Sequence, residues 1–308
     1  MRKWLQNTRG YLNRFFLLNE FVQLPVEILK NIGSSIPLFK HLKEKHSHRN
    51  IDLPGEMERL LNVFDILRRR CNLNIEGKTI LEIGPGKSLV IGLLFIACGA
   101  KKVFLFDRFK RLFWDEYDIA FHKRVLEYVL KGFPFPSEAS KAIILQNCDS
   151  IDFDRNKIDY RLCDAANIPL ENSSIDIVFT NAVLEHIHDI RKAISEISRV
   201  TKLGGFGFHQ IDLRDHFVKT KPLRLLQYSD LLWNLMTSNR PGYTNRLRLP
   251  DYLKLFKSHR FTVKKLAITR EYDGDLTNLK IAKKFRSYSF EDLRVLTFWI
   301  LLQRSGQE

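Results

Sequence analysis

Hydrophobic and polar residues alternate in blocks from residue 78 onward, where short apolar and β-branched runs are followed by longer stretches with a helical pattern. This alternation is typical of βαβ units, in which helices connect the strands of a parallel sheet. Helices are expected over residues 88–98, 114–130, 190–202 and 250–259. Strands are expected over residues 79–83, 103–106, 158–163, 175–180, 206–211, 261–268 and 295–302. The pattern predicts an α/β domain with seven strands.

Residues that begin or end helices add detail to this pattern. Asp189 precedes the third expected helix, where its carboxylate can accept the free amides of the first turn. Gly204 and Gly205 are expected to end that helix before the fifth strand begins.

Two regions lie outside the alternating pattern. Residues 1–76 contain amphipathic patterns over 11–24 and 57–71 but no motif, and we interpret them as an N-terminal helical extension. Residues 77–308 form the predicted main domain. Within it, residues 212–249 are a long insertion after the fifth strand, rich in Leu, Arg and aromatic residues. Ligands of open α/β sheets bind beyond the carboxyl ends of the strands, so this insertion is expected on the substrate side.

Composition limits where such a protein could reside. The chain has 308 residues and 44% hydrophobic content, but its longest apolar runs reach only about half of the roughly 20 residues that a membrane-spanning helix needs. Polar residues interrupt the start of the chain, so no secretory signal is expected. The four cysteines are far apart, with no metal-binding spacing, and we interpret them as reduced thiols. Together these features predict a cytoplasmic protein without a membrane span.

The net charge of +15 is concentrated in the flanks of the chain. Residues 1–76 carry 13 basic and 8 acidic residues, residues 77–212 carry 18 of each, and residues 213–308 carry 19 basic and 9 acidic residues. Basic flanks can attract nucleic acid, an anionic membrane surface or an anionic substrate, although a solvated surface is an equal alternative.

A glycine turn follows the first expected strand, in the segment Glu82-Ile83-Gly84-Pro85-Gly86. A strand that enters a glycine turn and then a helix lets bare backbone approach a ligand. Asp107 ends the next strand 21 residues after Gly86, about where an acidic side chain meets ribose hydroxyls. The dinucleotide fingerprint would require a third glycine at position 89, which is Leu89 here, so a nicotinamide cofactor is disfavoured.

Residues 77–212 resemble the class I S-adenosylmethionine-dependent methyltransferases, particularly the broad group that includes small-molecule and sugar methyltransferases. The motifs that carry the resemblance are the Glu82 to Gly86 turn, Asp107, Cys163-Asp164-Ala165 with Ile168-Pro169-Leu170, and Ser174 to Val178 leading to Asn181-Ala182-Val183-Leu184-Glu185-His186. One departure is Ser88, which replaces a third glycine often found in the first motif. The resemblance implies a Rossmann-like, mostly parallel sheet of seven strands flanked by helices, with the last strand antiparallel.

The resemblance also implies S-adenosyl-L-methionine as cofactor and assigns residues to it. Gly84, Pro85 and Gly86 would form the turn along its methionine portion, with Glu82 anchoring that turn. Asp107 would accept the ribose hydroxyls, and Asp164 with the Ala165 backbone would bind the adenine edge. Asn181 and Ala182 would lie beneath the sulfonium. As alternatives, Asp107 and Asp164 could cap strand ends and Asn181 could form a turn.

Methyl transfer to a hydroxyl usually needs a base that removes the proton. The candidates follow the fourth and fifth strands: His186, His209, Asp212, Asp215 and His216. The last three could instead hold a divalent cation. Structural alternatives remain, since Asp212 and Asp215 could cap a helix beginning near His216, and His186 could hold a turn.

Two arginines offer a substrate contact. Arg246 and Arg248 lie on one side of an extended segment, in a stretch that resembles one seen in some glycan-associated methyltransferases. They could bind an anionic group of the substrate, or they could be ordinary surface arginines.

Three functions are compatible with these features. The first is an O-methyltransferase acting on a small molecule or a glycan. The second is a nucleic-acid methyltransferase, motivated by the basic flanks, although the Asn/Asp-Pro-Pro-Tyr/Phe motif of base aminomethylation is absent and Asn181 is followed by Ala182. The third is a non-catalytic adapter that keeps the fold and contacts a membrane or a partner. The intact cofactor motifs favour the first.

Overall fold

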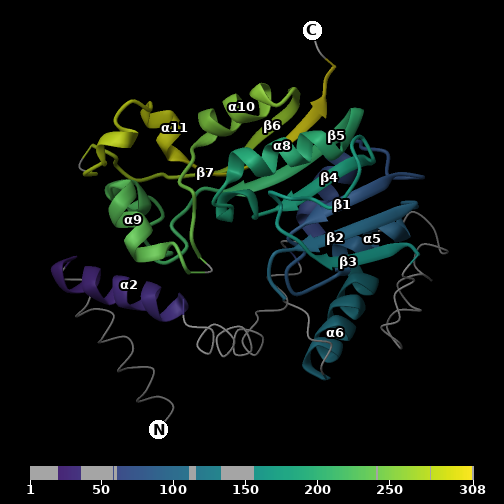
Figure 1. Ribbon diagram of the computed structural model, residues 1–308, viewed down its shortest axis with the longest axis horizontal. Helices are drawn as coiled ribbons and strands as arrows, with labels where there is room; N and C mark the ends of the chain where they lie inside the picture. The colour runs from purple at the N-terminus through teal and green to yellow at the C-terminus, as the bar shows by residue number, and fades with distance from the viewer. Residues whose placement is uncertain are drawn as a thin grey trace. The chain divides into compact units, whose positions relative to one another are not determined.

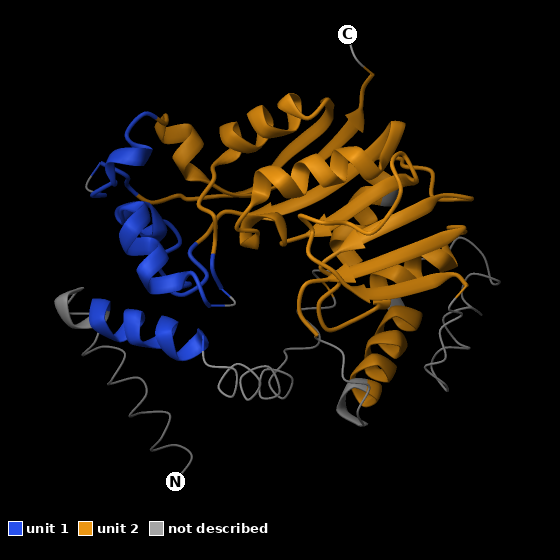
Figure 2. Cartoon of the chain, viewed as in Figure 1, with its two compact units in different colours: residues 1–45, 215–243, 275–287 blue, residues 46–214, 244–274, 288–308 orange. Residues whose placement is uncertain are grey.

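The computed structural model describes residues 20–35, 58, 61–110, 116–132, 156–240, 242–277 and 279–306. The chain divides into two compact units (Figure 2). Unit 1 comprises Met1–Lys45, Asp215–Tyr243 and Asp275–Ser287, and unit 2 comprises His46–Arg214, Thr244–Gly274 and Tyr288–Glu308. The domain boundary expected between residues 76 and 77 stays a prediction.

Unit 2 is built on a seven-stranded sheet with the order β3-β2-β1-β4-β5-β7-β6 (Figure 1). The five strands from β3 to β5 pair in parallel, whereas β7 is antiparallel to both β5 and β6. The strands are β1 (Thr79–Ile83), β2 (Lys102–Asp107), β3 (Ile158–Leu162), β4 (Ile175–Asn181), β5 (Thr201–Asp212), β6 (Phe261–Glu271) and β7 (Val295–Arg304). This arrangement confirms the predicted Rossmann-like, mostly parallel sheet with its antiparallel last strand.

Helices cover both faces of the sheet. On one face lie α5 (Val90–Ala97), α6 (Glu116–Gly132) and residues 61–75, and on the other lie α8 (Ile190–Val200) and α10 (Leu249–Ser258). Alternate strand residues supply the two cores, because successive side chains of a strand point to opposite faces. Ile80 accordingly belongs to the first core and Leu81 to the second.

The predicted helix ends are partly confirmed. Asp189 caps α8 and accepts the N–H of Lys192 at 3.1 Å, as expected. The helix, however, ends at Val200, and β5 begins directly afterwards, five residues before the predicted strand. Gly204 has a φ of +74° and lies where the pairing of β4 with β5 shifts register. The glycine pair therefore serves an irregularity within β5, and the prediction that it ends the helix was wrong.

The predicted N-terminal helices are seen in part. The described part of the first is α2 (Glu20–Ser35), which continues through Pro25 and extends beyond the expected end at residue 24. Residues 11–19 lie outside the described residues. In the second, residues 61–65 are helical and are followed by a short π-helix, η1 (Ile66–Arg70).

Unit 1 joins α2 to the insertion after β5, although almost 200 residues separate them in sequence. The insertion contains η3 (Arg224–Gln227) and α9 (Asp230–Thr237). The side-chain amide of Asn31 donates to the carbonyl of Leu235 at 3.0 Å and accepts the N–H of Asn239 at 2.8 Å. Asn31 is 4% exposed, so these bonds replace lost contacts with water and fix the helix pair.

The sequence predicted no membrane-spanning helix and reduced cysteines. Within them, no helix is both long and apolar enough to span a bilayer. Cys71, Cys98 and Cys163 form no disulfide in this part of the chain, and Cys148 lies outside it.

Candidate cofactor and acceptor site

The predicted cofactor residues meet at one edge of the sheet. Gly84 follows β1, Asp107 ends β2, Asp164 follows β3 and Asn181 ends β4. These four strands are parallel, so their carboxyl ends lie at the same edge. Because β1 lies between β2 and β4, this edge contains the topological switch point at which open α/β sheets bind ligands.

The glycine turn has the backbone conformation that its residues predict. Gly84 and Gly86 have φ values of +75° and +70°, in the left-handed region that favours glycine. The Gly84 N–H donates to the carbonyl of Phe106 at 2.7 Å, which joins the turn to β2. Among the described residues other than its chain neighbours, no atom lies within 4 Å of the position that a Cβ would take on Gly86. The turn thus leaves room for a ligand against its backbone.

Asp107 holds this turn in place. Its Oδ2 atom accepts the N–H of Gly86 at 3.1 Å, and its Oδ1 atom accepts the N–H of Phe109 at 2.8 Å. The side chain is almost fully buried. A carboxylate oxygen has more than one lone pair, so a carboxylate can accept bonds both from backbone amides and from a ligand hydroxyl.

Glu82 lies on β1 beneath the turn and is 4% exposed. Burial, together with the nearby negative charge of Asp107, raises the pKa of Glu82 to about 8. Its Oε2 atom has no hydrogen-bond partner among the described residues. Glu82 is therefore mostly neutral near pH 7 and retains an unused hydrogen-bonding atom.

The loop after β3 presents Asp164 at the surface and Ala165 in the core. Asp164 accepts the N–H of Ala166 at 2.9 Å and lies 3.5 Å from Arg108. Asp164 was expected either to cap the strand end or to bind adenine. Its carboxylate forms a local turn after β3, and it is the same carboxylate that the family resemblance assigns to adenine.

An ion pair on α8 fixes the rest of that loop. Arg199 donates to the carbonyls of Ile168 and Leu170 at 2.8 and 2.7 Å, and its Nε atom lies 2.7 Å from Glu196. Glu196 in turn accepts the N–H of Ile168 at 2.8 Å. This pair has no distinctive sequence signal, since Glu and Arg three residues apart on a helix usually form a surface ion pair.

The chain turns sharply at the end of β4. Ala182 has a φ of +55°, and its N–H donates to the carbonyl of Gln210 on β5 at 3.0 Å. A left-handed alanine costs roughly 1–2 kcal/mol, so the surrounding bonds must hold it. Asn181 precedes it and is half-buried. This turn leads into a short 3₁₀ helix, η2 (Leu184–His186).

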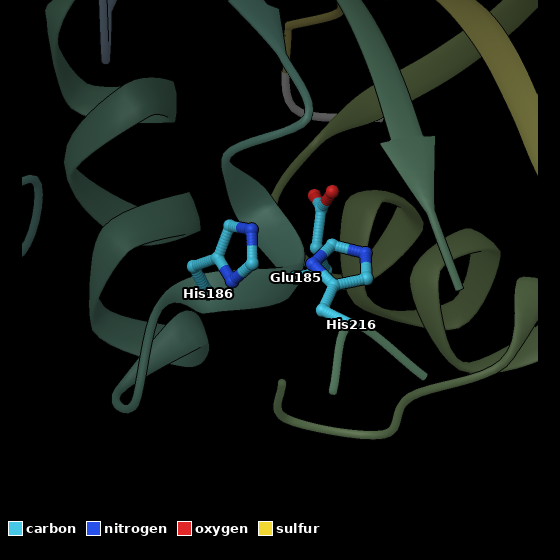
Figure 3. Close-up of side chains that lie close together, drawn as sticks. All are labelled: Glu185, His186 and His216. Carbon is cyan, nitrogen blue, oxygen red and sulfur yellow. The ribbon is translucent and has the colours of Figure 1, made fainter. Parts of the chain in front are cut away.

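Helix η2 carries one predicted base and one carboxylate that the sequence analysis did not select. Glu185 and His186 are neighbours on this helix (Figure 3), whereas the third labelled residue, His216, belongs to unit 1. His186 is half-buried. Glu185 is 1% exposed, and its Oε1 atom accepts the N–H of Asp212 at 3.2 Å. Glu185 thus ties η2 to the end of β5.

His209 lies within the core. Its ring stacks on Phe256 of α10 at 5.4 Å between centroids, and its Nδ1 atom is 2.9 Å from Oγ1 of Thr180. Complete burial lowers the pKa of His209 to about 3. The predicted alternation along β5 is correct, but the face that carries His209 is covered by α10. We therefore assign His209 to the core and not to proton transfer.

Asp212 and Asp215 fall into different units. Arg214 binds the Asp212 carboxylate, with Nε 2.8 Å from Oδ1. Asp215 accepts the N–H groups of Phe217 and Val218 at 2.7 and 3.0 Å, and burial raises its pKa. No helix begins near His216, so the predicted cap is a turn instead.

The two candidate substrate arginines are both buried. Arg248 is 0% exposed and donates to the carbonyls of Leu213 at 3.0 Å and Leu293 at 2.9 Å, as well as to that of Val295. Its Nη donors therefore serve the backbone, which gives Arg248 a structural role. Arg246 is 3% exposed with a φ of +62°, so neither arginine lies in an open surface loop.

Residues 94–208 match the family model described as a methyltransferase domain, a segment that includes Asp107, Asp164 and Asn181. Together with the sheet order, this match confirms the superfamily that the motifs predicted. Over this segment the chain is similar to methyltransferase domains, in agreement with the class I S-adenosylmethionine-dependent methyltransferase superfamily that the motifs predicted.

Solved structures with a similar fold share little sequence with this chain. One is from Mesorhizobium loti, an S-adenosylmethionine-dependent methyltransferase with 13% identity and a TM-score of 0.48, covering 78% of this chain and 97% of that chain. Another is from the complex between the Haloferax volcanii Trm112 methyltransferase activator and a methyltransferase, with 14% identity and a TM-score of 0.47, covering 83% and 94%. No curated protein matches the chain. Likeness at this level identifies neither a substrate nor a partner.

Proposed function

We propose that this protein transfers a methyl group from S-adenosyl-L-methionine to a hydroxyl of a small-molecule or glycan acceptor. The observation that carries the proposal is the glycine turn at the switch point of the sheet, held by the bond from Gly86 to Asp107. The open space above Gly86 and the unused Oε2 atom of Glu82 fit a ligand that lies against this turn.

In this proposal, the other predicted cofactor residues each bind a different part of the cofactor. Asp107 accepts the ribose hydroxyls, Asp164 and the Ala165 backbone bind the adenine, and Asn181 with Ala182 lies beneath the sulfonium. When bound, the cofactor supplies a methyl group that is already reactive, so the protein mainly aligns the acceptor and excludes water.

His186 is the proposed base, and a ring nitrogen of His186 takes the proton of the acceptor hydroxyl as the methyl group is transferred. Support comes from its half-buried position on η2, directly after the turn at Ala182. In unit 2, His209 is enclosed in the core and Asp212 is bound by Arg214. Roles for Asp215 and His216 stay predictions.

Two experiments test the proposal. Calorimetric titration with S-adenosylmethionine should give heat with the wild type and much weaker binding with Asp107→Ala, and the absence of heat with the wild type would contradict cofactor binding. Incubation with methyl-labelled cofactor should then label a small molecule or glycan in fractions of the source cell.

A parallel arm with polynucleotide at low salt tests nucleic-acid methylation, since binding to phosphates is strongest there. An arm with anionic vesicles tests the predicted contact of the basic flanks with a membrane.

A further inference from the structure

Asn245 lies in the segment before α10 and donates hydrogen bonds to three backbone carbonyls in η2 and directly after it. Its side-chain Nδ2 atom donates to the carbonyl of Leu184 at 2.8 Å and to that of Ile187 at 3.3 Å. Its backbone N–H donates to the carbonyl of Glu185 at 2.7 Å. One residue, about 60 positions later in the chain, therefore supplies hydrogen bonds to almost every carbonyl at the end of this helix.

Helix η2 needs such donors because it is very short. A helix leaves its last carbonyls without partners inside the helix, and 3₁₀ hydrogen bonds have poorer geometry than α-helical ones. At the C-terminal end of η2, the N–H of Ile187 reaches the carbonyl of Leu184 only at 3.4 Å. The bonds from Asn245 thus act as a cap supplied from another part of the fold.

Asn245 is itself held in one orientation. Its Oδ1 atom accepts the N–H of Leu247 at 3.1 Å and the hydroxyl of Tyr252 at 3.3 Å. Tyr252 is fully buried on α10, and burial raises its pKa well above the usual value, so the hydroxyl remains a donor. With Oδ1 accepting these bonds, the amide must point its Nδ2 atom toward η2.

Helix η2 is also tied to β5, through the bond between Glu185 and Asp212. The helix that carries His186 is therefore held both by the bonds from Asn245 and by the bond of the Glu185 side chain to β5. Both attachments lie at the carboxyl ends of β4 and β5, within unit 2.

We propose that Asn245 is a positioning residue for the acceptor side of the methyl-transfer site, acting through η2 on the ring of His186. This inference rests on the proposed function for its catalytic meaning, but its structural step can be tested without it. Displacement of a reacting group by about 1 Å can lower a rate by about 100-fold. Once an acceptor is known, Asn245→Ala should therefore lower kcat by about 10–100-fold with the KM for the cofactor unchanged.

The direct test follows the ring resonances of His186 by NMR, which needs no acceptor. Asn245→Ala should shift and broaden these resonances, whereas Asn74→Ala, a change in an exposed asparagine before β1, should leave them in place. His186→Gln assigns the signals. Binding of S-adenosylmethionine, measured by calorimetry, should stay within about twofold of the wild type, because the hydrogen bonds of Asn245 to described residues go to η2, Ile187, Leu247 and Tyr252.

The outcomes separate the two proposals. Unchanged His186 resonances in a folded Asn245→Ala variant would overturn the positioning role. If Asn245→Ala does not fold, Tyr252→Phe provides the test, because it removes only the hydroxyl that orients the Asn245 amide, and it should give a smaller shift in the same direction. No shift with Tyr252→Phe would then overturn the proposal. Failure of the wild type to bind cofactor would contradict the proposed function and leave the NMR result intact.

Discussion

The side chain of Val183 occupies the space that a Cβ on Gly84 would need. An added Cβ would lie 2.4 Å from Cγ2 of Val183, far inside van der Waals contact. Val183 follows the turn at the end of β4. This contact therefore packs the segment after β4 against the glycine turn after β1. Gly86 has a similar φ but open space around its Cβ position. The two glycines of the turn therefore have different requirements.

This difference predicts unequal effects of two alanine substitutions. Gly84→Ala should lower the free energy of unfolding by about 2–5 kcal/mol, the sum of roughly 1–2 for the left-handed backbone and about 1–3 for overpacking. Gly86→Ala should lower it by only about 1–2 kcal/mol, because the backbone term acts alone. Urea denaturation measures both.

A double variant separates the two causes. Val183→Ala should recover part of the loss in the Gly84→Ala background, because it removes the methyl groups that clash. Equal losses for Gly84→Ala and Gly86→Ala, with no recovery in the double variant, would show that the contact with Val183 does not limit this position.

Asp107 should dominate cofactor affinity. Asp107→Asn keeps the shape of the side chain but removes its charge and one acceptor, and hydrogen bonds to charged groups contribute about 1.5–3 kcal/mol each. We expect the Kd for S-adenosylmethionine to rise by about 10–100-fold in calorimetric titrations. Asp159→Asn on β3, whose carboxylate pairs with Arg161, is the matched control and should bind normally. Normal affinity of Asp107→Asn would remove Asp107 from the cofactor site.

Glu82 predicts an unusual dependence of stability on pH. Its pKa is raised from the ordinary 4.5 to about 8, so the folded protein binds more protons at this site than the unfolded chain between these values. The contribution of Glu82 to stability is complete below about pH 4.5 and is lost as the pH rises toward 8. Glu82→Gln is neutral at every pH and lacks this loss. In urea denaturation, the wild type should therefore become less stable relative to Glu82→Gln as the pH rises from 5 to 8, and a constant difference would contradict a protonated Glu82.

Arg199 should act on the adenine side through the loop that it binds. Arg199→Lys keeps the charge but loses the planar fork that reaches both the Ile168 and Leu170 carbonyls. We expect the free energy of unfolding to fall by about 1–3 kcal/mol and cofactor affinity to weaken severalfold. Arg161→Lys, which changes a more exposed pair on β3, should leave both unchanged. A stability loss with intact affinity would confine Arg199 to a structural role.

Local sequence signals predicted the sheet well, because strands such as β1 and β4 are short apolar runs and the predicted cofactor residues Asp107 and Asn181 stand at strand ends. The extra length of β5 was missed because its first residues include a glycine pair that also suits a helix end. The acceptor side could not be predicted in the same way. Burial of His209 depends on α10, and the bonds from Asn245 to η2 join segments about 60 residues apart. Such tertiary contacts leave no local pattern, and they decide which polar residues remain accessible.

Thr180 and His209 form a buried polar pair whose removal predicts one further result. His209→Leu alone leaves the Thr180 hydroxyl buried without its partner, which should cost about 1–3 kcal/mol, whereas His209→Leu with Thr180→Val removes both groups and should cost less. Because the pKa of His209 is about 3, below its ordinary 6.5, its contribution to stability is present above pH 6.5 and is lost as the pH falls toward 3. Denaturation series at pH 4 to 8 should show the wild type losing its advantage over the double variant at low pH. Methyl transfer, once measurable, should keep its pH profile in the double variant, and a changed profile would return His209 to the catalytic candidates.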